Sequence, residues 1–178
     1  MNGNRILGNL AGAGDGGGVS LARINGQDVA ESPGTFQDWF SIGLYNNMVV
    51  NNVAGLAGGG IGLQDAAAVR IIHNPVAHND STATAGEAFT TLVDPTAGTS
   101  SEAQPAGIVA HAHTPALASA VGGGTALDPY RTFSNPELVN TILWENRSFF
   151  WQIDNTGFGL VPRTAGPHWD LGVQGTAG

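Results

Sequence analysis

Apolar residues recur along this chain in a short repeated motif rather than at helical spacing. Residues 4–9, 47–52 and 74–79 all have the pattern Asn-x-Ile/Val-x-x-Asn, and residues 141–146 keep its apolar position and its final Asn. Asn52 and Asn79, which end two of the copies, are 27 positions apart. A fixed spacing of this size is typical of repeat architectures, in which each unit buries its apolar side against its neighbours. We therefore predict short strands that stack unit on unit.

A second element follows the first in two of the copies. Gly-Gly-Gly leads into an apolar-x-Leu strand at residues 16–21 and 58–63, with a degraded third copy at 122–127. Asn tolerates the left-handed backbone region at a corner, its amide stacks in ladders, and Gly permits conformations that a Cβ forbids. We expect a ladder of four corner residues, Asn9, Asn52, Asn79 and Asn146. The inward apolar residues that accompany them are Ile6, Val49, Val76 and Leu143.

This combination predicts an all-β fold, a single-domain right-handed parallel β-helix over residues 1–178 with insertions at about 25–41 and 81–105. The first insertion is expected to pack Phe36, Trp39 or Phe40 back onto the coil. The second is predicted to be a mobile loop with a helical turn at 85–91. Strand or short-helix signals follow at 106–112 and 116–121, and a further strand is expected at 169–173.

Composition narrows the function classes. The chain carries a formal net charge of −8, with six Arg and no Lys, so it lacks the clustered positive charge that nucleic acid or an anionic membrane requires. No apolar run is long enough for a membrane span. The absence of Cys excludes disulfides, thiolate nucleophiles and cysteine metal sites.

Because no polar capping element precedes the first repeat or follows the last, we expect the chain to be a segment of a longer protein. Open ends of a stacked repeat expose core and unpaired strand edges. We expect the aromatic insertion around Phe36, Trp39 and Phe40, or residues 162–168, to fold over an end. The alternative is a homo-oligomer formed by end-to-end stacking.

On residues 4–21, 44–80 and 136–154 the chain resembles right-handed parallel β-helix proteins of the pectin-lyase-like superfamily, in particular uncharacterised bacterial exported proteins with the same Asn and Gly repeats. The resemblance implies an extracellular or cell-surface location and a polysaccharide or glycan as partner. That superfamily includes lyases, hydrolases, esterases and adhesins, so fold alone does not choose an activity. We expect a non-catalytic module, structural or glycan-binding. The alternative is a polysaccharide-active glycoside hydrolase or lyase with carboxylates in its groove.

For the enzymatic alternative, three carboxylates are the candidate catalytic residues. Asp65 and Asp80 each lie just past a repeat element, and Glu145 lies inside a corner, so stacking brings them to related positions. Glycoside hydrolysis needs two carboxyl groups about 5 to 9 Å apart. The competing interpretation is that these acids form turns or are simply solvated.

Two further groups have candidate binding chemistry. His111 and His113 alternate on a strand and would share one face, which suits a divalent metal if another coil supplies a third ligand; otherwise they are hydrogen-bonded or face solvent and no cofactor is present. Trp144, Phe150 and Gln152 are candidates for stacking on a sugar ring and bonding its hydroxyls. The alternative is that the rings pack under the long loop.

Overall fold

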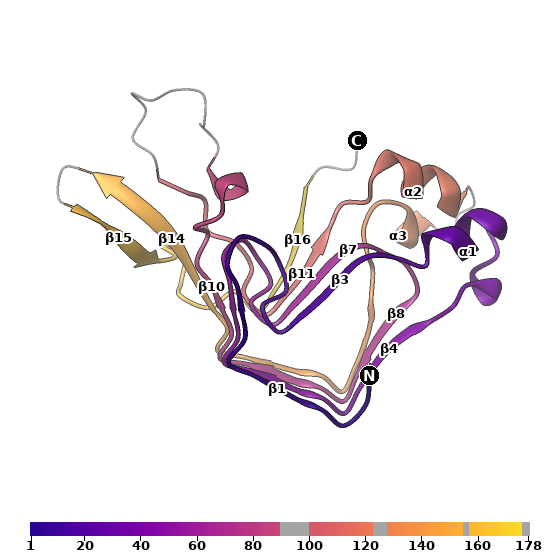
Figure 1. Ribbon diagram of the computed structural model, residues 1–178, viewed down its shortest axis with the longest axis horizontal. Coiled ribbons are helices and arrows are strands. Elements are labelled where there is room, and N and C mark those ends of the chain that lie inside the picture. The colour runs from indigo at the N-terminus through magenta and orange to yellow at the C-terminus, as the bar shows by residue number, and fades with distance from the viewer. Residues whose placement is uncertain (90–99, 123–127, 155–156, 176–178) are drawn as a thin grey trace.

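The computed structural model describes residues 1–89, 100–122, 128–154 and 157–175, and the protein is mostly β-strand with a few short helices (Figure 1). The predicted all-β class is confirmed at this level. Most of the expected Gly-rich copy at 122–127 lies outside the described residues. Among the residues described, no helix has the length and apolar character needed to cross a bilayer.

Among the described residues the strands form four sheets, and neighbouring strands pair in parallel except in the antiparallel β14–β15 hairpin. The first sheet contains β1 (Arg5–Leu7), β5 (Met48–Val50), β9 (Pro75–Ala77) and β13 (Ile142–Trp144). The second contains β2 (Leu10–Ala11), β6 (Val53–Ala54), β10 (Asp80–Ser81), β14 (Arg147–Asp154) and β15 (Gly157–Pro162). The third contains β3 (Val19–Ile24), β7 (Ile61–Ala66), β11 (Ile108–His111) and β16 (Leu171–Gln174). The fourth contains β4 (Ile42–Tyr45), β8 (Val69–Ile72) and β12 (Glu137–Val139).

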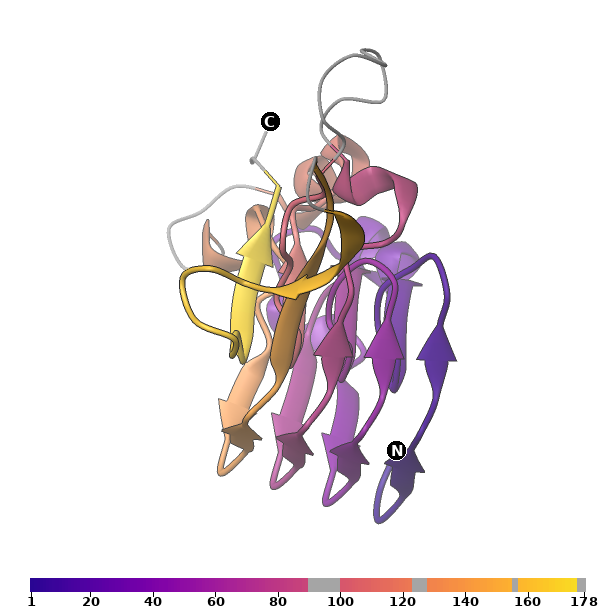
Figure 2. The ribbon, with the colours of Figure 1, turned by 90° about the vertical axis from the view of Figure 1, so that its left-hand side faces the viewer.

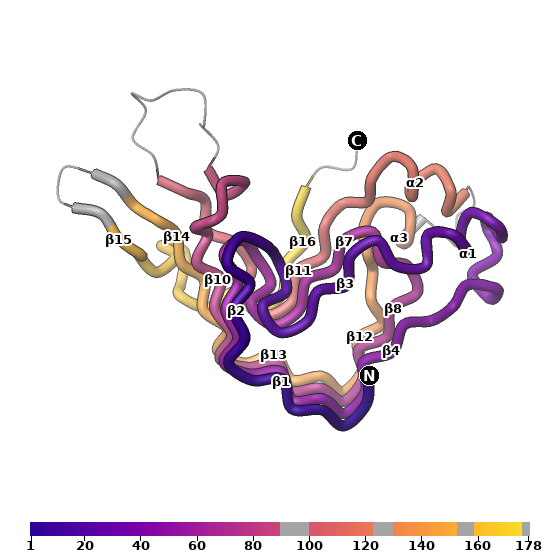
Figure 3. Tube along the Cα trace, viewed as in Figure 1, coloured from indigo at the N-terminus to yellow at the C-terminus, as the bar shows by residue number. Residues whose placement is uncertain are grey.

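The chain visits these sheets in the same order on each pass. We call the passes coils: coil 1 covers residues 5–45, coil 2 residues 48–72, coil 3 residues 75–139 and coil 4 residues 142–174. Figure 2 shows equivalent strands of successive coils side by side, and the tube in Figure 3 shows their corners superimposed. Coil 2 has no insertion, which explains the 27-residue spacing between its ladder asparagines and those of coil 3.

The core lies inside the coils, and the predicted inward residues stack in register. Val49 pairs with Ile6 on one side and Val76 on the other, and Val76 pairs with Leu143. Val49 and Val76 are almost fully buried in one continuous apolar cluster, which also contains Ile61. The apolar position of the repeated motif therefore supplies one side of the core.

The predicted asparagine ladder is confirmed. The Oδ1 atom of Asn52 accepts hydrogen bonds from Nδ2 and the backbone N–H of Asn9, at 2.9 and 3.0 Å. Asn79 accepts from Asn52 in the same way, and Asn146 accepts from Asn79. Asp170 ends the ladder by accepting from Asn146 Nδ2 at 2.6 Å, so a carboxylate that cannot donate occupies the last position.

A second ladder runs along the neighbouring corner. Asn4 donates to Asn47, and Asn47 donates to Asn74 at 3.0 Å between side chains. Thr141 replaces Asn in coil 4, where its Oγ1 atom accepts from the Asn74 backbone at 3.4 Å. The first Asn of the motif therefore forms a ladder, as the last Asn does. A ladder was predicted only for the last Asn.

The left-handed conformation at these corners belongs to the residue before each ladder position. Our expectation that the ladder asparagines themselves adopt it was wrong. A left-handed residue turns the backbone, and the next residue, in ordinary conformation, directs its amide inward to the ladder. The left-handed corner residues of coils 2 to 4 are Asn46, Asn51, His73, His78, Asn140 and Glu145.

The first insertion packs beside the coils. It contains α1 (Gly26–Glu31) and the 3-10 helix η1 (Phe36–Asp38), and it meets α2 (Pro115–Val121) and α3 (Asp128–Arg131) on one side of the molecule (Figure 1). Trp39 is buried in a cluster with Val29, Leu117 and Val121, and Phe36 packs against that cluster. Trp39 and Phe36 therefore provide the packing that was expected of Phe36, Trp39 or Phe40, whereas Phe40 is 76% exposed.

This lateral packing means that the aromatic insertion does not cover an end of the coil. The other expected cover, residues 162–168, lies along the corner of coil 4. There the Pro167 carbonyl accepts from the Ser148 N–H at 2.8 Å, and the backbone of His168 forms an isolated antiparallel β-bridge with that of Arg147. In the second insertion, η2 (Gly86–Ala88) falls within the predicted helical turn. Mobility was predicted for residues 81–105, of which 90–99 lie outside the described residues, and it stays a prediction.

Candidate ligand-binding cleft

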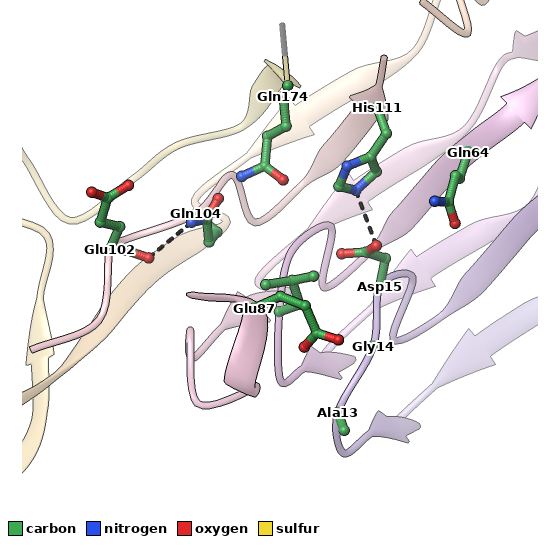
Figure 4. Close-up of a pocket in the computed structure, with 11 residues that line it drawn as sticks. Ala13, Gly14, Asp15, Gln64, Glu87, Glu102, Gln104, His111 and Gln174 are labelled. Atoms are coloured by element: carbon green, nitrogen blue, oxygen red, sulfur yellow. Dashed lines mark hydrogen bonds and ion pairs between the residues drawn. The ribbon is translucent and has the colours of Figure 1, made fainter. Parts of the chain in front are cut away.

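A polar cleft of about 570 Å³ opens between the third sheet, the loop that joins β2 to β3, and the second insertion (Figure 4). It collects side chains from every coil. Its polar lining residues are Asp15, Gln64, Glu87, Glu102, Gln104, His111 and Gln174. Such a concentration of hydrogen-bonding groups in one cavity makes the cleft the candidate functional site.

One wall of the cleft is a row of planar polar side chains on adjacent strands. His111 pairs in register with Gln174, and its neighbour Ala110 pairs with Leu63, which places Gln64 beside His111 on the other side. Figure 4 shows Gln174, His111 and Gln64 in this order across the sheet. Neighbouring strands lie about 4.8 Å apart. The row therefore presents an amide, an imidazole and an amide at regular intervals along the coil axis.

Asp15 faces the centre of this row. It lies in the loop between β2 and β3, where its Oδ1 atom accepts from the Ala57 N–H at 3.0 Å and is thereby fixed to coil 2. Its Oδ2 atom lies 3.0 Å from Nε2 of His111, and each side chain is 17% exposed. Nε2 has no hydrogen-bond partner among the described residues. We treat the pair as an electrostatic contact that orients the imidazole.

The remaining acids of the cleft come from the second insertion. Glu87 belongs to η2 and is exposed. Glu102, which follows residues 90–99 in the chain, is also exposed. Gln104 lies beside Glu102, with Nε2 donating to the Glu102 carbonyl at 3.0 Å. Three carboxylates and three amides thus surround one imidazole. This set accepts and donates hydrogen bonds freely, which suits a ligand rich in hydroxyl groups.

None of the three predicted catalytic carboxylates lines this cleft. Asp65 is buried, and its Oδ1 atom accepts from the Thr114 N–H at 2.8 Å. Asp80 binds Arg147 through both carboxylate oxygens, at 2.8 and 2.7 Å. Glu145 occupies an outer corner, 3.6 Å from His78 Nδ1. The structure gives each acid a different local role, and their catalytic function stays a prediction.

The two predicted metal ligands face different carboxylates. His111 contacts Asp15 in the cleft, whereas His113 is buried with Nδ1 3.4 Å from Asp65 Oδ1. Within the part of the chain that the structure describes, no three or more His, Asp or Glu side chains lie close enough to hold a metal ion together. A divalent metal at His111 and His113 stays a prediction.

The predicted sugar-stacking residues lie on two strands. Trp144 lies on β13, and its side chain is 57% exposed. Phe150 and Gln152 are half-buried in the β14–β15 hairpin, where Phe150 pairs with Val161 and Gln152 with Gly159. None of the three lines the cleft. Their role in ligand binding also stays a prediction.

Buried His113 should make the fold sensitive to acid. Burial lowers its pKa below the ordinary value of 6.5, and nearby Asp65 opposes this shift only in part. Below about pH 6.5 the unfolded chain therefore binds a proton that the folded protein resists, so the free energy of unfolding falls as pH decreases, by up to about 1.4 kcal/mol per pH unit. Above that pH the neutral form is present in both states and this sensitivity disappears.

Urea unfolding midpoints between pH 8 and pH 5 measure the effect. His113→Gln should flatten the decline below pH 6.5, whereas the matched change at exposed His168 should leave it intact. Equal pH profiles for the parent protein and the His113→Gln variant would contradict the assignment.

No protein-family model, curated protein or solved structure matches the chain. The resemblance to the pectin-lyase-like superfamily stays a prediction, and function has to be inferred from the cleft.

Proposed function

We propose that this protein is a right-handed parallel β-helix module that binds an extended carbohydrate chain in the cleft. The β-helix assignment is supported by the repeated order of sheets through the coils and by the two side-chain ladders along its corners. In such a module the coils provide a rigid frame, and insertions in individual coils provide the binding surface.

The row formed by Gln64, His111 and Gln174 is the observation that carries the ligand assignment. Regularly spaced amides and an imidazole match a polymer that presents hydroxyl groups at every residue, provided that the polymer lies along the coil axis. The opposing acids, Asp15, Glu87 and Glu102, accept hydrogen bonds from the same hydroxyls. Because these acids repel anions, the cleft favours a neutral or amino-sugar glycan over a polymer of uronic acids.

A hydrolase is the second candidate, because one cleft holds several carboxylates. Glycoside hydrolysis uses a pair of carboxyl groups on either side of the scissile bond. Asp15, held by the Ala57 N–H and beside His111, is the candidate nucleophile or base, and Glu87 in the same cleft is the candidate acid. This candidate shares the ligand of the first and adds a reaction.

A glycan array followed by titration of the bound glycan tests both candidates. Gln64→Ala and Gln174→Ala should each weaken binding at least tenfold, about 1.4 kcal/mol, by removing amides from the row. Gln27→Ala is the matched control, since Gln27 is exposed on α1 and its side chain donates to Glu31 within that helix. Retained affinity in both cleft variants would overturn the proposed site.

Release of reducing sugar from the bound glycan separates the two candidates. A binding module releases none, whereas a hydrolase releases sugar and loses this activity in Glu87→Gln while still binding. An extracellular or cell-surface location and end-to-end stacking of chains accompany this proposal as predictions.

A further inference from the structure

A second cavity, which we call the aromatic groove, lies between the first insertion and the outer side of the fourth sheet. Its volume is about 620 Å³, within the range of small-molecule sites. It shares no lining residue with the cleft. Its lining combines an aromatic side, Phe36, Trp39 and Tyr130, with a polar side, Gln37, Ser41, Arg70, Asn135 and Glu137.

The aromatic side is held rigidly before any ligand arrives. The rings of Phe36 and Tyr130 pack with centroids 4.8 Å apart, and those of Phe36 and Trp39 pack at 5.5 Å. Trp39 is almost fully buried, and its Nε1–H donates to the Ser32 carbonyl at 2.9 Å. Ligand binding here therefore requires little ordering of the aromatic side chains, which is a cost that weakens most flexible sites.

The polar side is electrically neutral. Arg70 and Glu137 pair in register on β8 and β12, with Arg70 Nε 3.0 Å from Glu137 Oε2. Both side chains remain about half exposed, at 48% and 54%, so they keep further donors and acceptors open to a ligand. They are the charged side chains in the lining, and their charges cancel. Exposed Gln37 and Asn135 add amide groups.

From these two sides we infer that the aromatic groove binds a neutral saccharide. A pyranose ring has an apolar C–H face that packs on aromatic rings and an edge of hydroxyl groups that requires paired donors and acceptors. The groove supplies the rings through Phe36 and Tyr130 and the polar groups through Arg70, Glu137 and Asn135. A charged ligand is disfavoured, because the Arg70–Glu137 pair leaves no net charge to complement it. This site is independent of the cleft.

Heteronuclear NMR of the full chain tests the inference, because the indole N–H of Trp39 reports directly on the groove and is assigned by its loss in Trp39→Phe. Titration with neutral mono- and oligosaccharides, up to ~10 mM, should shift the Trp39 indole signal and the side-chain amides of Gln37 and Asn135. Glucuronic acid, the charged counterpart of glucose, should shift them at least tenfold less at equal concentration.

Glu137→Gln and Asn135→Ala should each weaken saccharide binding about tenfold or more. Glu137 belongs to a half-exposed ion pair, so its substitution should leave the fold intact. Glu31→Gln is the matched control, since Glu31 lies on the same insertion as Phe36 but outside the groove. Gln64→Ala should also leave the groove response unchanged, which separates this inference from the proposed function of the cleft.

Two outcomes would overturn the inference. One is the absence of any shift of the Trp39, Gln37 and Asn135 signals over the saccharide panel. The other is a shift that persists unchanged in Glu137→Gln and Asn135→Ala.

Discussion

Replacing Asn52 by Ala should destabilise the protein by about 3 kcal/mol, because a buried donor and acceptor each lose their partner. Asn52 is fully buried. Its Oδ1 atom accepts from Asn9, and its Nδ2 atom donates to the Ile6 carbonyl at 3.0 Å and to Asn79 Oδ1 at 2.9 Å. The substitution leaves the buried Oδ1 atom of Asn79 and the partly buried Ile6 carbonyl without the Asn52 amide. The shift of the urea midpoint at constant slope measures the loss.

Asn9→Ala is the matched control for this prediction. Asn9 begins the same ladder but is exposed, so water replaces the bonds that its side chain loses. We expect a loss of about 1 kcal/mol or less at this position. If Asn9→Ala and Asn52→Ala destabilised the protein equally, the ladder would not owe its strength to burial, and the stacking explanation of the repeated Asn would fail.

The parts of the fold that could be predicted are those encoded within one repeat. The motif places an apolar residue three positions before its final Asn, and this spacing recurs in the structure as the Val49 and Asn52 pair and the Val76 and Asn79 pair. Register between coils follows because a slip by one residue would move each buried apolar residue to the outer face. In these motif copies the local pattern and the stacking between coils favour the same structure, so the pattern alone was enough to predict it.

The third coil was harder to predict because its long insertions hide the repeat. A strand or short helix was expected at 106–112, and β11 lies there, but its equivalence to β7 was not recognised. Only Gly107 remains of the Gly triplet, and Ile108 pairs directly with Ile61. The third Gly-rich copy was instead predicted at 122–127, which has more glycines. The apolar residue that follows the last Gly identifies the equivalent strand better than the number of glycines does.

The cleft escaped prediction because its residues share no local motif and belong to different coils. Gln64, His111 and Gln174 are distant in sequence and become neighbours only once the strand register is known. A signal was nevertheless present: each follows an apolar-x-apolar strand segment directly. Asp15 could not be found in this way, because a loop of irregular conformation carries it to His111.

The Gly triplets have the expected conformational basis only at their first position. Only the first Gly of each triplet is left-handed, Gly16 with φ 71° and Gly58 with φ 59°. The second and third are required for space: a Cβ on Gly59 would lie 2.2 Å from the Asp80 carbonyl oxygen. The backbone of the neighbouring coil therefore occupies the volume that a side chain would fill, so the triplet marks the closest approach of two backbone segments.

Gly59→Ala should consequently destabilise the protein by about 3 kcal/mol or more, since overpacking against backbone cannot be relieved by turning a side chain. The contacts are to the carbonyl oxygen, carbonyl carbon and nitrogen of Asp80, at 2.2, 2.7 and 2.7 Å, so coil 3 must shift relative to coil 2. Gly12→Ala is the control, because no atom lies within 4 Å of its added Cβ and its φ is not positive. That change should be neutral or slightly stabilising, through the lower entropy of the unfolded chain. Thermal and urea unfolding of the two variants decide the point: similar stabilities would show that the coils are not packed backbone to backbone at the triplet, and that its glycines serve only to form a turn.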